Sequence, residues 1–477
     1  MTRHLLVAAA GLCPLVAGAA HGQVDLYRFQ RQLEQIQRET RLLVDHDVPA
    51  DQRALLDYGG FVAVNFLAID DVNQNTHILR QTDLNGYLRV NLDGAHEFFL
   101  RARTSYRDFN TGDAFRSSGD DWVEPTLDRA HYRFDLQRYL AAYEGRVIPG
   151  NVIVQGGRQL VHWANGLTLS HEIDGAVVQL SRRRLTLDIL AGITRDSATD
   201  LDSSRPGFTN ETNRNFLGGM LSFRPNARHR PYVYGIVQRD NNPSEVLVAG
   251  RTTTKFEYNS YYLGFGSNGS LGDHVVYGAE FVFEGGDGLS NSINGAGAAI
   301  PQTTEDIEAF AMDVRLDYLV TDRNRTRLSA EFLLASGDTD RDTATNTIGG
   351  NASGTKDHGF NAFGLINTGL AFNPAVSNLI MVRAGASTFP LKGSHWFDRL
   401  QLGVNLFMFN KFNRNGGIDE ATTDGTILGW ESDLFANWQA TSDVTVSLRY
   451  GVFIPGDAIA GEQDERHFFF SGLTFAF

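Results

Sequence analysis

The chain has 477 residues, a formal net charge of −14 and a mean hydropathy of −0.24. An acidic balance of this size argues against a nucleic-acid partner. Outside the first two dozen residues, no run approaches the roughly 18 apolar residues of a membrane-spanning helix. The 49 Gly, 32 Phe and 15 Tyr, against 5 Met, favour strands and turns, so the length fits several soluble domains or one large closed sheet.

Residues 1–22 are predicted to be a secretory signal peptide. Arg3 supplies a basic start, residues 5–16 form an apolar core, and small residues at 18–22 suit a peptidase. The only cysteine, Cys13, lies in this segment, and Leu12 before it does not suit a lipoprotein site. The mature chain therefore has no disulfide and no thiolate ligand or nucleophile. Loss of Arg3 leaves 41 basic against 56 acidic residues, a net charge of −15.

Residues 23–48 are predicted to form a short amphipathic periplasmic helix, which Pro49 ends. Apolar and small side chains step by three and four along it, at Leu26, Phe29, Leu33, Ile36, Thr40 and Leu43. The favoured interpretation is a helix lying against the mouth or lumen of the domain that follows. The alternative is a coiled coil joining several subunits, although fewer than three heptads is marginal for that.

From Tyr58 onward the hydrophobic period is two, which is typical of β-strands. In residues 96–108, Phe98, Leu100 and Ala102 alternate with Arg101 and Arg103. The same pattern recurs in residues 310–318, 400–408, 444–452 and at the C-terminus, "HFFFSGLTFAF". One face of each strand is free of charge and the other carries it. A soluble β-sandwich also alternates, so the pattern alone does not decide the class.

The connections favour a membrane barrel. Short turns, "LDGAH", "SRRRL", "TDRN" and "ATSD", alternate with long polar loops at 109–123, 196–212, 241–253, 285–305, 412–426 and 455–465. Together with strands of about ten residues and a signal peptide, this predicts an all-β fold, a transmembrane antiparallel up-and-down barrel over residues 58–477 in the outer membrane.

Both ends of such a barrel are periplasmic, so the number of strands is even. Nineteen segments are candidates, and the weakest is "FNAFGLINTGLAF" at 360–372, because glycine and asparagine interrupt it. We assign it to a long surface or inward-folded loop. About 18 strands remain, enough to enclose an aqueous channel.

The charged face of the strands is predicted to line the lumen, since a lipid-facing Lys or Arg costs roughly 2–4 kcal/mol at mid-membrane. The basic residues expected there are Arg89, Arg101, Arg103, Arg107, Arg129, His131, Arg133, Arg315, Arg327, Arg383 and Arg449. The acidic ones are Asp135, Asp313, Asp317, Glu331, Glu431 and Asp433. For any single arginine a cross-strand ion pair is the favoured role. For the dense stripe on residues 96–108 and 126–137, guidance of anions is an equal alternative, because forked guanidinium groups suit carboxylates and phosphates.

Two segments resemble the alginate export family of outer-membrane barrels. "VQGGRQLVHWANGLTLSHEIDG" is similar to that family's Gly-Arg-Gln strand, here Gly157, Arg158 and Gln159. "LGWESDLFANWQATSDVTVSLRYGVFIPGDA" is similar to its closing segment, here Glu431, Asp433, Tyr450, Gly451, Pro455, Gly456 and Asp457. The resemblance implies a porin-like barrel of eighteen strands whose arginine-rich pore passes a uronate polymer outward.

Two features depart from the family pattern. One is the N-terminal helix. The other is the phase of Arg158, because alternation with Val152 and Val154 would direct it to lipid unless Gly156 and Gly157 form a bulge that resets the register.

Four long loops concentrate carboxylates, in "SSGDDWVE", "SGDTDRDT", "GGIDEATTDG" and "GEQDER". Solvated loops are the usual meaning of such segments. The alternative is that Ca²⁺ bridges these groups, since it prefers oxygen ligands. None of them has EF-hand spacing, and we predict no other metal or cofactor.

The chain carries neither a G-x-S-x-G nor an H-E-x-x-H motif, so we predict that it is not an enzyme. The predicted function is an outer-membrane channel for passive export or diffusion of anionic solutes, with a uronate polysaccharide such as alginate as the candidate. Its expected partners are outer-membrane lipid, the anionic solute and a periplasmic export partner, with oligomer formation left open. The alternatives are a general-diffusion porin, or a structural or adhesive barrel blocked by the N-terminal helix and residues 337–376.

Overall fold

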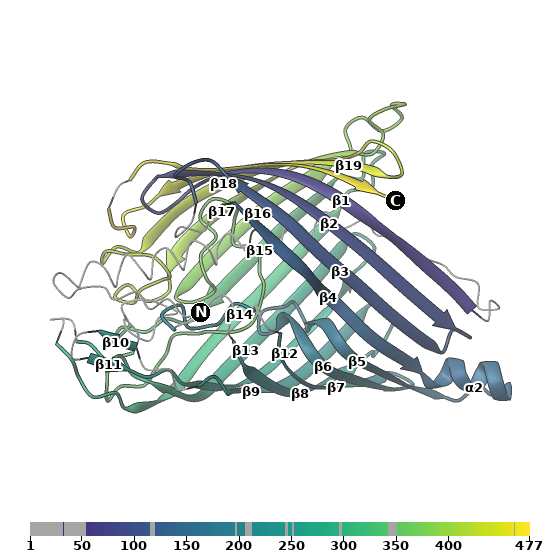
Figure 1. Cartoon of the computed structure of the whole chain (residues 1–477), viewed down its shortest axis with the longest axis horizontal. Helices are drawn as coiled ribbons and strands as arrows, with labels where there is room; N and C mark the ends of the chain where they lie inside the picture. The colour runs from purple at the N-terminus through teal and green to yellow at the C-terminus, as the bar shows by residue number, and fades with distance from the viewer. Residues whose placement is uncertain are drawn as a thin grey trace.

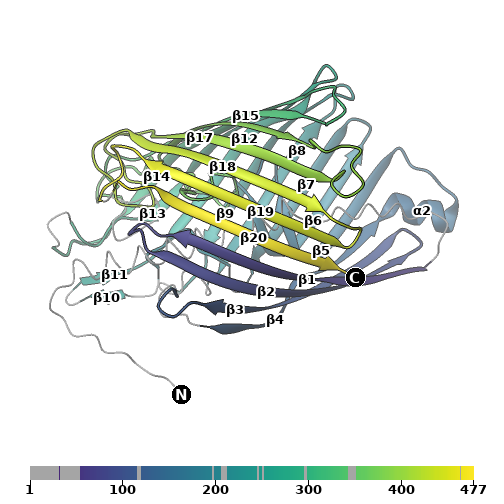
Figure 2. The same ribbon diagram turned by 90° about the horizontal axis from the view of Figure 1, so that it is seen from above.

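Eighteen antiparallel strands close into one barrel (Figures 1 and 2). This computed structural model describes residue 32 and residues 54–114, 120–195, 198–205, 212–243, 247–249, 252–294, 298–341, 351–461 and 463–477. Closure comes from β1 (Ala54–Asp70), which pairs with β2 on one side and with the last strand, β20, on the other. The predicted fold class and the predicted eighteen strands are confirmed.

Each strand pairs with its neighbours in chain order. The remaining barrel strands are β2 (Thr76–Leu92), β3 (His96–Phe109), β4 (Asp121–Asp135), β5 (Gly150–His162), β6 (Ser170–Arg182), β7 (Leu185–Thr194), β8 (Arg214–Phe223), β9 (His229–Asp240), β12 (Tyr258–Leu271), β13 (Val275–Leu289), β14 (Thr304–Leu319), β15 (Arg327–Ala335), β16 (Leu379–Thr388), β17 (Leu400–Lys411), β18 (Ile427–Gln439), β19 (Val444–Pro455) and β20 (Arg466–Ala476). A separate hairpin is made by β10 (Leu247–Ala249) and β11 (Thr252–Thr254). Both views place this hairpin at one end of the barrel and α2 (Leu136–Glu144) at the other.

The helix α2 was not predicted from the sequence, although both of its end signals are present. Asp135 is its N-cap and accepts a hydrogen bond from the Arg138 backbone N–H at 3.1 Å. Gly145 follows its last turn with φ of 61°, a left-handed conformation that glycine adopts without strain. Among the described residues no helix has the length and apolarity needed to cross a bilayer.

The two faces of the wall differ in burial as the alternation predicts. On β2, Leu84 and Leu88 are exposed on the outside, whereas Gln81, Asp83 and Asn85 are buried on the inside. The C-terminal strand does the same, with Phe469, Leu473 and Phe475 exposed. Apolar side chains that would be unfavourable in water therefore cover the outer face, where a bilayer supplies their solvent.

Between β15 and β16, the described residues 336–341 and 351–378 contain no strand and fold into the lumen. Within it Phe363 forms a backbone bridge to Leu169, and Asp357 forms one to Ile307 of β14. This confirms that residues 360–372 are an inward-folded loop and not a nineteenth strand. The loop contributes Phe360, Ile366 and Phe372 to a buried apolar cluster inside the barrel.

The predicted signal peptide and N-terminal helix lie outside the described residues, apart from Gln32. That residue is helical and buried, and its side-chain amide donates a hydrogen bond to the Leu370 carbonyl of the inward loop. Gln32 is therefore in contact with the loop that folds into the lumen. The two domain assignments remain predictions.

Leu84 lies at the midpoint of β2 with its side chain on the outer face. We expect Leu84→Arg to lower the free energy of unfolding from bilayers by roughly 2–4 kcal/mol, because a guanidinium there faces hydrocarbon. Urea unfolding of the protein in phospholipid vesicles measures this, with Leu84→Met as the matched control. Equal stability of the two variants would contradict a lipid-facing position.

Candidate functional site

A stripe of arginines runs down the inner face of β2, β3 and β4. Its members are Arg89, Arg101, Arg103, Arg107, Arg129 and Arg133, with His131 among them. The cross-strand register aligns Arg101 with Arg129 and Phe99 with His131. Because paired residues of antiparallel strands share a face, the three strands contribute to one continuous basic surface, which we call the arginine stripe.

Three carboxylates on the same strands pair with the arginine stripe. Arg89 Nη2 lies 2.6 Å from Glu97 Oε2, and Arg103 Nη2 lies 3.0 Å from Asp83 Oδ1. Arg101 Nε donates to Asp128 at 2.8 Å. The arginine side chains of these pairs keep 27%, 26% and 16% exposure, so their guanidinium groups remain within reach of a solute in the lumen.

Two members of the arginine stripe, Arg107 and Arg133, form no ion pair with a described residue. Arg107 stands opposite Gln81 and Asp121 in the register, near the long-loop end of β3. Arg133 stands opposite Glu97 and Gln155, near the short-turn end of β4. At both ends of the arginine stripe a carboxylate therefore stands opposite the arginine in the register without forming an ion pair with it, Asp121 beside Arg107 and Glu97 beside Arg133.

The arginines of the opposite wall are held in ion-pair networks. Arg315 Nε lies 2.9 Å from both Asp313 and Glu331, and Arg383 also pairs with Glu331. Arg327 Nη2 lies 2.7 Å from Asp317. These contacts link β14, β15 and β16 across their inner faces, as expected for residues that stiffen the wall.

Arg449 of β19 is also held by side chains of the wall. Arg449 is 3% exposed, donates to Asn437 Oδ1 at 2.9 Å and lies over the ring of Phe435. The structure thus places the predicted lumen residues on the inner face. Arg449 is buried there, whereas the side chains of Arg315 and Arg327 keep 33% and 54% exposure.

Carboxylates on β13 and β18 anchor the loops that fold into the lumen. Glu280 accepts a hydrogen bond from the Asn165 backbone N–H at 2.8 Å, and Glu284 accepts one from Asn361 at 2.7 Å. Glu431 accepts from the backbone N–H groups of Leu370, Ala371 and Phe372, the last two at 2.7 and 2.9 Å. A single carboxylate therefore closes the turn at 370–372 against the wall.

Glu431 and Asp433 were predicted to line the pore, and the structure shows what covers them. They are 3% and 2% exposed, because residues 369–372 lie over β18. Phe372 stacks on Phe453 of β19 with ring centroids 4.1 Å apart and planes 4° from parallel. The acidic side of the lumen is therefore screened by backbone and aromatic rings, whereas the arginine stripe is not.

The family motif at 157–159 has a structural role for each residue. Gly157 has φ of 123°, and a Cβ there would lie 2.2 Å from the Ala130 carbonyl oxygen. Gln159 points inward, is 4% exposed, and donates to the Gly175 carbonyl at 3.2 Å. Only glycine permits β5 to approach β4 this closely.

Arg158 lies on the outer face, because the pairing of β5 with β6 continues without a register shift. Its guanidinium forms two parallel hydrogen bonds of 2.7 Å to Asp174 of β6. Its third contact, Nη1 to the Leu127 carbonyl, is 2.8 Å long. Gly157 therefore does not reset the alternation, and side-on pairing with Asp174 neutralises a charge that faces lipid.

No group of three or more His, Cys, Asp or Glu side chains is arranged to hold a metal ion among the residues with described positions. Several carboxylates of the acidic loops have protein partners instead. Glu420 pairs with Arg466 in a buried contact, and Asp419 accepts from the Ala375 backbone N–H at 3.1 Å.

A buried charge cluster in the loop after β7 was missed from the sequence. Asp200 is fully buried and binds Arg214 of β8, with Arg214 Nη2 2.6 Å from Oδ1. Arg205 and Asp240 complete the cluster. Burial alone would raise the pKa of the Asp200 carboxyl, but the charge and hydrogen bonds of Arg214 outweigh it and hold the pKa at about 2. The Asp200–Arg214 ion pair joins a loop residue to a strand residue fourteen positions later, and no sequence motif predicts it.

The partners of the arginine stripe were also missed. Asp83 shares the inward phase of Gln81 and Asn85, so alternation on β2 could have found it. Asp128 could not be found this way, because the β3–β4 register shifts between Arg101 and Ala102.

A closed barrel with an apolar exterior, a charged lumen and loops folded inward defines an outer-membrane channel of porin type. The chain belongs to the alginate export family, whose model matches residues 65–470. The protein therefore resides in the outer membrane. Its family and fold are those of channels, which are not enzymes.

Solved porins share the fold at low sequence identity. Acinetobacter baumannii OccAB1 is 11% identical with a TM-score of 0.53, over 88% of this chain and 96% of that one. Pseudomonas aeruginosa OpdK, crystallised with vanillate, is 12% identical with a TM-score of 0.51, over 88% of this chain and 98% of that one. Pseudomonas aeruginosa OccK8 (OprE) is 10% identical, with the same TM-score and coverage as OpdK. A comparison with curated proteins found no match.

Asp200→Asn is expected to loosen the loop after β7, because it leaves buried Arg214 without its closest charge. Breaking a buried pair in this way costs about 3–5 kcal/mol. Limited proteolysis of protein in vesicles measures the loosening, with Asp273→Asn, whose side chain is 82% exposed, as the control. In the wild type the contribution of Asp200 is complete above the ordinary pKa of 3.8 and is lost as the pH falls toward 2. Unchanged protection of the loop in Asp200→Asn would contradict this.

Glu431→Ala is expected to release residues 370–372 from β18, since three backbone N–H groups lose their acceptor. We expect single-channel current to become noisier and the mean conductance to rise by about half or more, as a loop that narrows the lumen gains freedom. Glu465→Gln, at an exposed loop carboxylate, is the control. Identical conductance and noise in both variants would show that this loop does not limit the current.

Proposed function

We propose that the barrel passes anionic solutes by passive diffusion along the arginine stripe, and that its principal solute is a uronate polysaccharide such as alginate, exported outward. The observation that carries the proposal is the asymmetry of the lumen. The carboxylates of β13 and β18 are covered by inward loops, while the arginines of β2–β4 keep exposed guanidinium groups.

The spacing of the arginine stripe supports a polymer with repeated carboxylates. Alternate residues on one face of a strand are about 6–7 Å apart, so Arg101 and Arg103 offer successive guanidinium groups to successive sugar units. Pairing with Asp83, Glu97 and Asp128 orients three of the arginines without covering them. A solute carboxylate can then exchange from one guanidinium to the next without binding any of them tightly.

The family assignment supports the same solute class. Export would be driven by a periplasmic partner at the short-turn end of the barrel, where β1 begins and β20 ends. The proposal requires no cofactor, since selection depends on the width of the lumen and its electric field.

Planar-bilayer conductance of the mature chain tests the proposal. We expect anion selectivity and block by short uronate oligomers, both reduced at least about threefold when Arg101, Arg103 and Arg133 are changed to serine, because the field and the exchange sites are lost together.

Arg80→Ser is the matched control. This arginine lies on β2 with its side chain on the outer face, paired with Asp108. It removes one positive charge from the outer face without changing the lumen, and is compared with Arg103→Ser alone. Selectivity without uronate block would favour a general-diffusion porin, and absence of conductance in the wild type would favour a plugged barrel.

A further inference from the structure

Two adjacent short turns carry arginines and no carboxylate. The turn between β6 and β7 contains Arg183 and Arg184, directly after Arg182, and the turn between β8 and β9 begins at Arg224 and ends at Arg228. All five arginines are exposed, and we call them the basic turn cluster. Because β7 pairs with β8, the two turns are neighbours. The start of β5, which follows α2, pairs with the end of β6, so the cluster lies at the end of the barrel that carries α2 (Figure 1).

Each of the other short turns contains a carboxylate. These are Asp93 between β2 and β3, Glu144 between β4 and β5, Asp273 between β12 and β13, Asp322 between β14 and β15, Asp398 between β16 and β17, and Asp443 between β18 and β19. Among the described residues only Asp273 forms an ion pair with the basic turn cluster, at 2.9 Å from Arg228 Nη2. Both side chains of this pair are more than half exposed, and such pairs are weak. The positive charge of the cluster is therefore largely uncompensated.

The backbone of the first turn does not favour arginine. Arg183 has φ of 55°, in the left-handed region that glycine, asparagine and aspartate adopt most readily, and Asp93 has φ of 53° in the turn between β2 and β3. The two turns of the cluster are also joined. The Arg224 backbone N–H donates to the Arg184 carbonyl at 2.8 Å, and Arg184 Nη1 donates to the Pro225 carbonyl at 2.9 Å. The arginines are thus held side by side, at a backbone cost that their charge does not relieve.

The basic turn cluster lies directly beyond the lipid-facing apolar surface. In the cross-strand register Arg182 stands beside Leu185, and Leu185 stands beside Phe223. Leu185 and Phe223 are 50% and 41% exposed on the outer face, so Arg182, which shares their row, also points outward. The next outward row toward the middle of the wall contains Leu180 and Leu221, both exposed. Toward the turns, apolar side chains therefore come first and guanidinium groups follow.

This order matches a phospholipid of the inner leaflet. The short turns of an outer-membrane barrel face the periplasm, so a lipid of that leaflet has its tails beside Leu180 and Leu221 and its phosphate at the level of Arg182. Forked guanidinium groups suit phosphate oxygens, and clusters of four or more basic residues beside a membrane favour anionic headgroups. A solute in the lumen fits less well, because Arg182 points away from the lumen.

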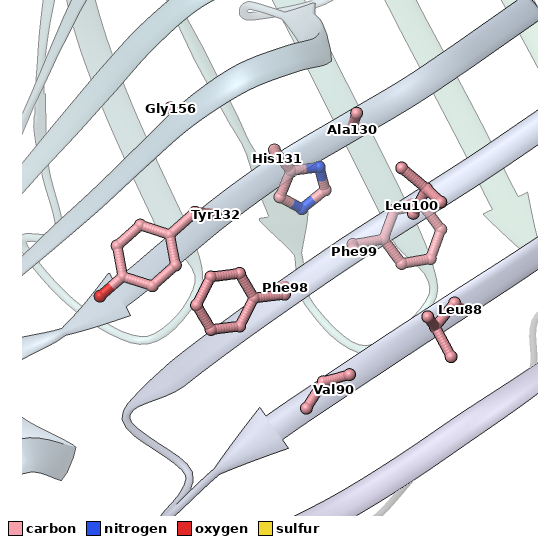
Figure 3. Close-up of a pocket in the computed structure, with 9 residues that line it drawn as sticks. All are labelled: Leu88, Val90, Phe98, Phe99, Leu100, Ala130, His131, Tyr132 and Gly156. Carbon is pink, nitrogen blue, oxygen red and sulfur yellow. The ribbon is translucent and has the colours of Figure 1, made fainter.

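An apolar groove on the outer face offers an internal comparison. It has a volume of ≈ 260 Å³, and Leu88, Phe98 and Tyr132 are among the side chains that line it (Figure 3). None of the described residues that line the groove is an arginine or a lysine. Lipid tails can therefore lie in this groove without a cation to bind the headgroup.

We propose that the basic turn cluster binds the phosphate of an anionic phospholipid of the inner leaflet, whose tails lie against the exposed leucines of β6, β7 and β8. The site faces the bilayer and not the lumen, so the inference goes beyond the proposed function and does not depend on the solute. A lipid held there would fix the level of the short-turn end of the barrel in the membrane.

Native mass spectrometry of the mature chain in detergent measures the affinity. We expect dioleoylphosphatidylglycerol to bind at least about tenfold more tightly than dioleoylphosphatidylcholine, because several guanidinium groups act on one anionic headgroup. In the triple variant Arg182→Gln, Arg184→Gln, Arg224→Gln we expect this preference to fall below about twofold. Equal binding of the two lipids by the wild type would overturn the proposal.

A second triple variant, Arg323→Gln with Arg325→Gln and Arg399→Gln, is the matched control. These three arginines are exposed at the same end of the barrel, on turns that also contain Asp322 or Asp398. The control loses the same charge, and we expect it to keep the wild-type preference. An equal loss in both triple variants would assign the preference to the overall charge of this end and would refute a site at the cluster.

Photolabelling of the wild type locates the lipid without any substitution. The mature chain in phosphatidylcholine vesicles is labelled with a trace of phosphatidylglycerol or phosphatidylcholine that carries a photoreactive tail, and labelled peptides are identified by mass spectrometry. At residues 176–190 and 217–224 we expect phosphatidylglycerol to give at least about fivefold more label than phosphatidylcholine. At residues 96–100 and 130–134, beside the apolar groove, we expect equal label. The same ratio at both places would count against the proposal.

Competition separates the lipid from other anions. Glycerol 3-phosphate and short uronate oligomers carry anionic groups without tails, and we expect neither to displace phosphatidylglycerol at equal concentration. Displacement by glycerol 3-phosphate would show a phosphate site that needs no lipid, and displacement by uronate would assign the cluster to the path of the solute; either result would overturn the proposal. Anion selectivity of the channel is expected to be unchanged in the Arg182, Arg184 and Arg224 variant, so failure of the lipid site leaves the proposed function intact.

Discussion

The cost of leaving a backbone amide unpaired in hydrocarbon governs this structure. A bilayer supplies no hydrogen-bonding partners, so the sheet must close on itself, and it does so where β1 meets β20. The same solvent sets the alternation along every strand, with Leu84 outside and Asp83 inside. β4 and β5 depart from this rule, because they pair only over residues 130–135 and 153–158, and the ion pair of Arg158 with Asp174 lies where their pairing ends.

On the inner face of the barrel, carboxylates and arginines make different contacts. Glu280, Glu284 and Glu431 accept hydrogen bonds from backbone N–H groups of the inward loops and are buried by them. Arg89, Arg101 and Arg103 instead pair with carboxylate side chains of the same wall. The carboxylates thus fix the inward loops, whereas these arginines stay on the wall with their side-chain partners.

Much of the fold was predictable because lipid enforces a pattern of period two. The strand count, the inward loop at 360–372 and the inward phase of Arg101, Arg103 and Arg133 all depend on alternation and on the even parity of such barrels. The helix α2 was missed although Asp135 and Gly145 mark its ends, because one nine-residue helix within strands gives a weak periodic signal.

The period-two pattern of the sequence alone determined which side chains face lipid and which face the lumen. Successive side chains of a strand point to opposite faces, and the bilayer stabilises apolar side chains on the outer one. Tertiary structure decided which of the inward charges a solute can reach. Glu431 and Arg101 have the same phase, yet one lies beneath residues 369–372 and the other does not. Loops that cross the lumen and strands that part after six paired residues depend on contacts between distant segments, whose closure no local spacing encodes.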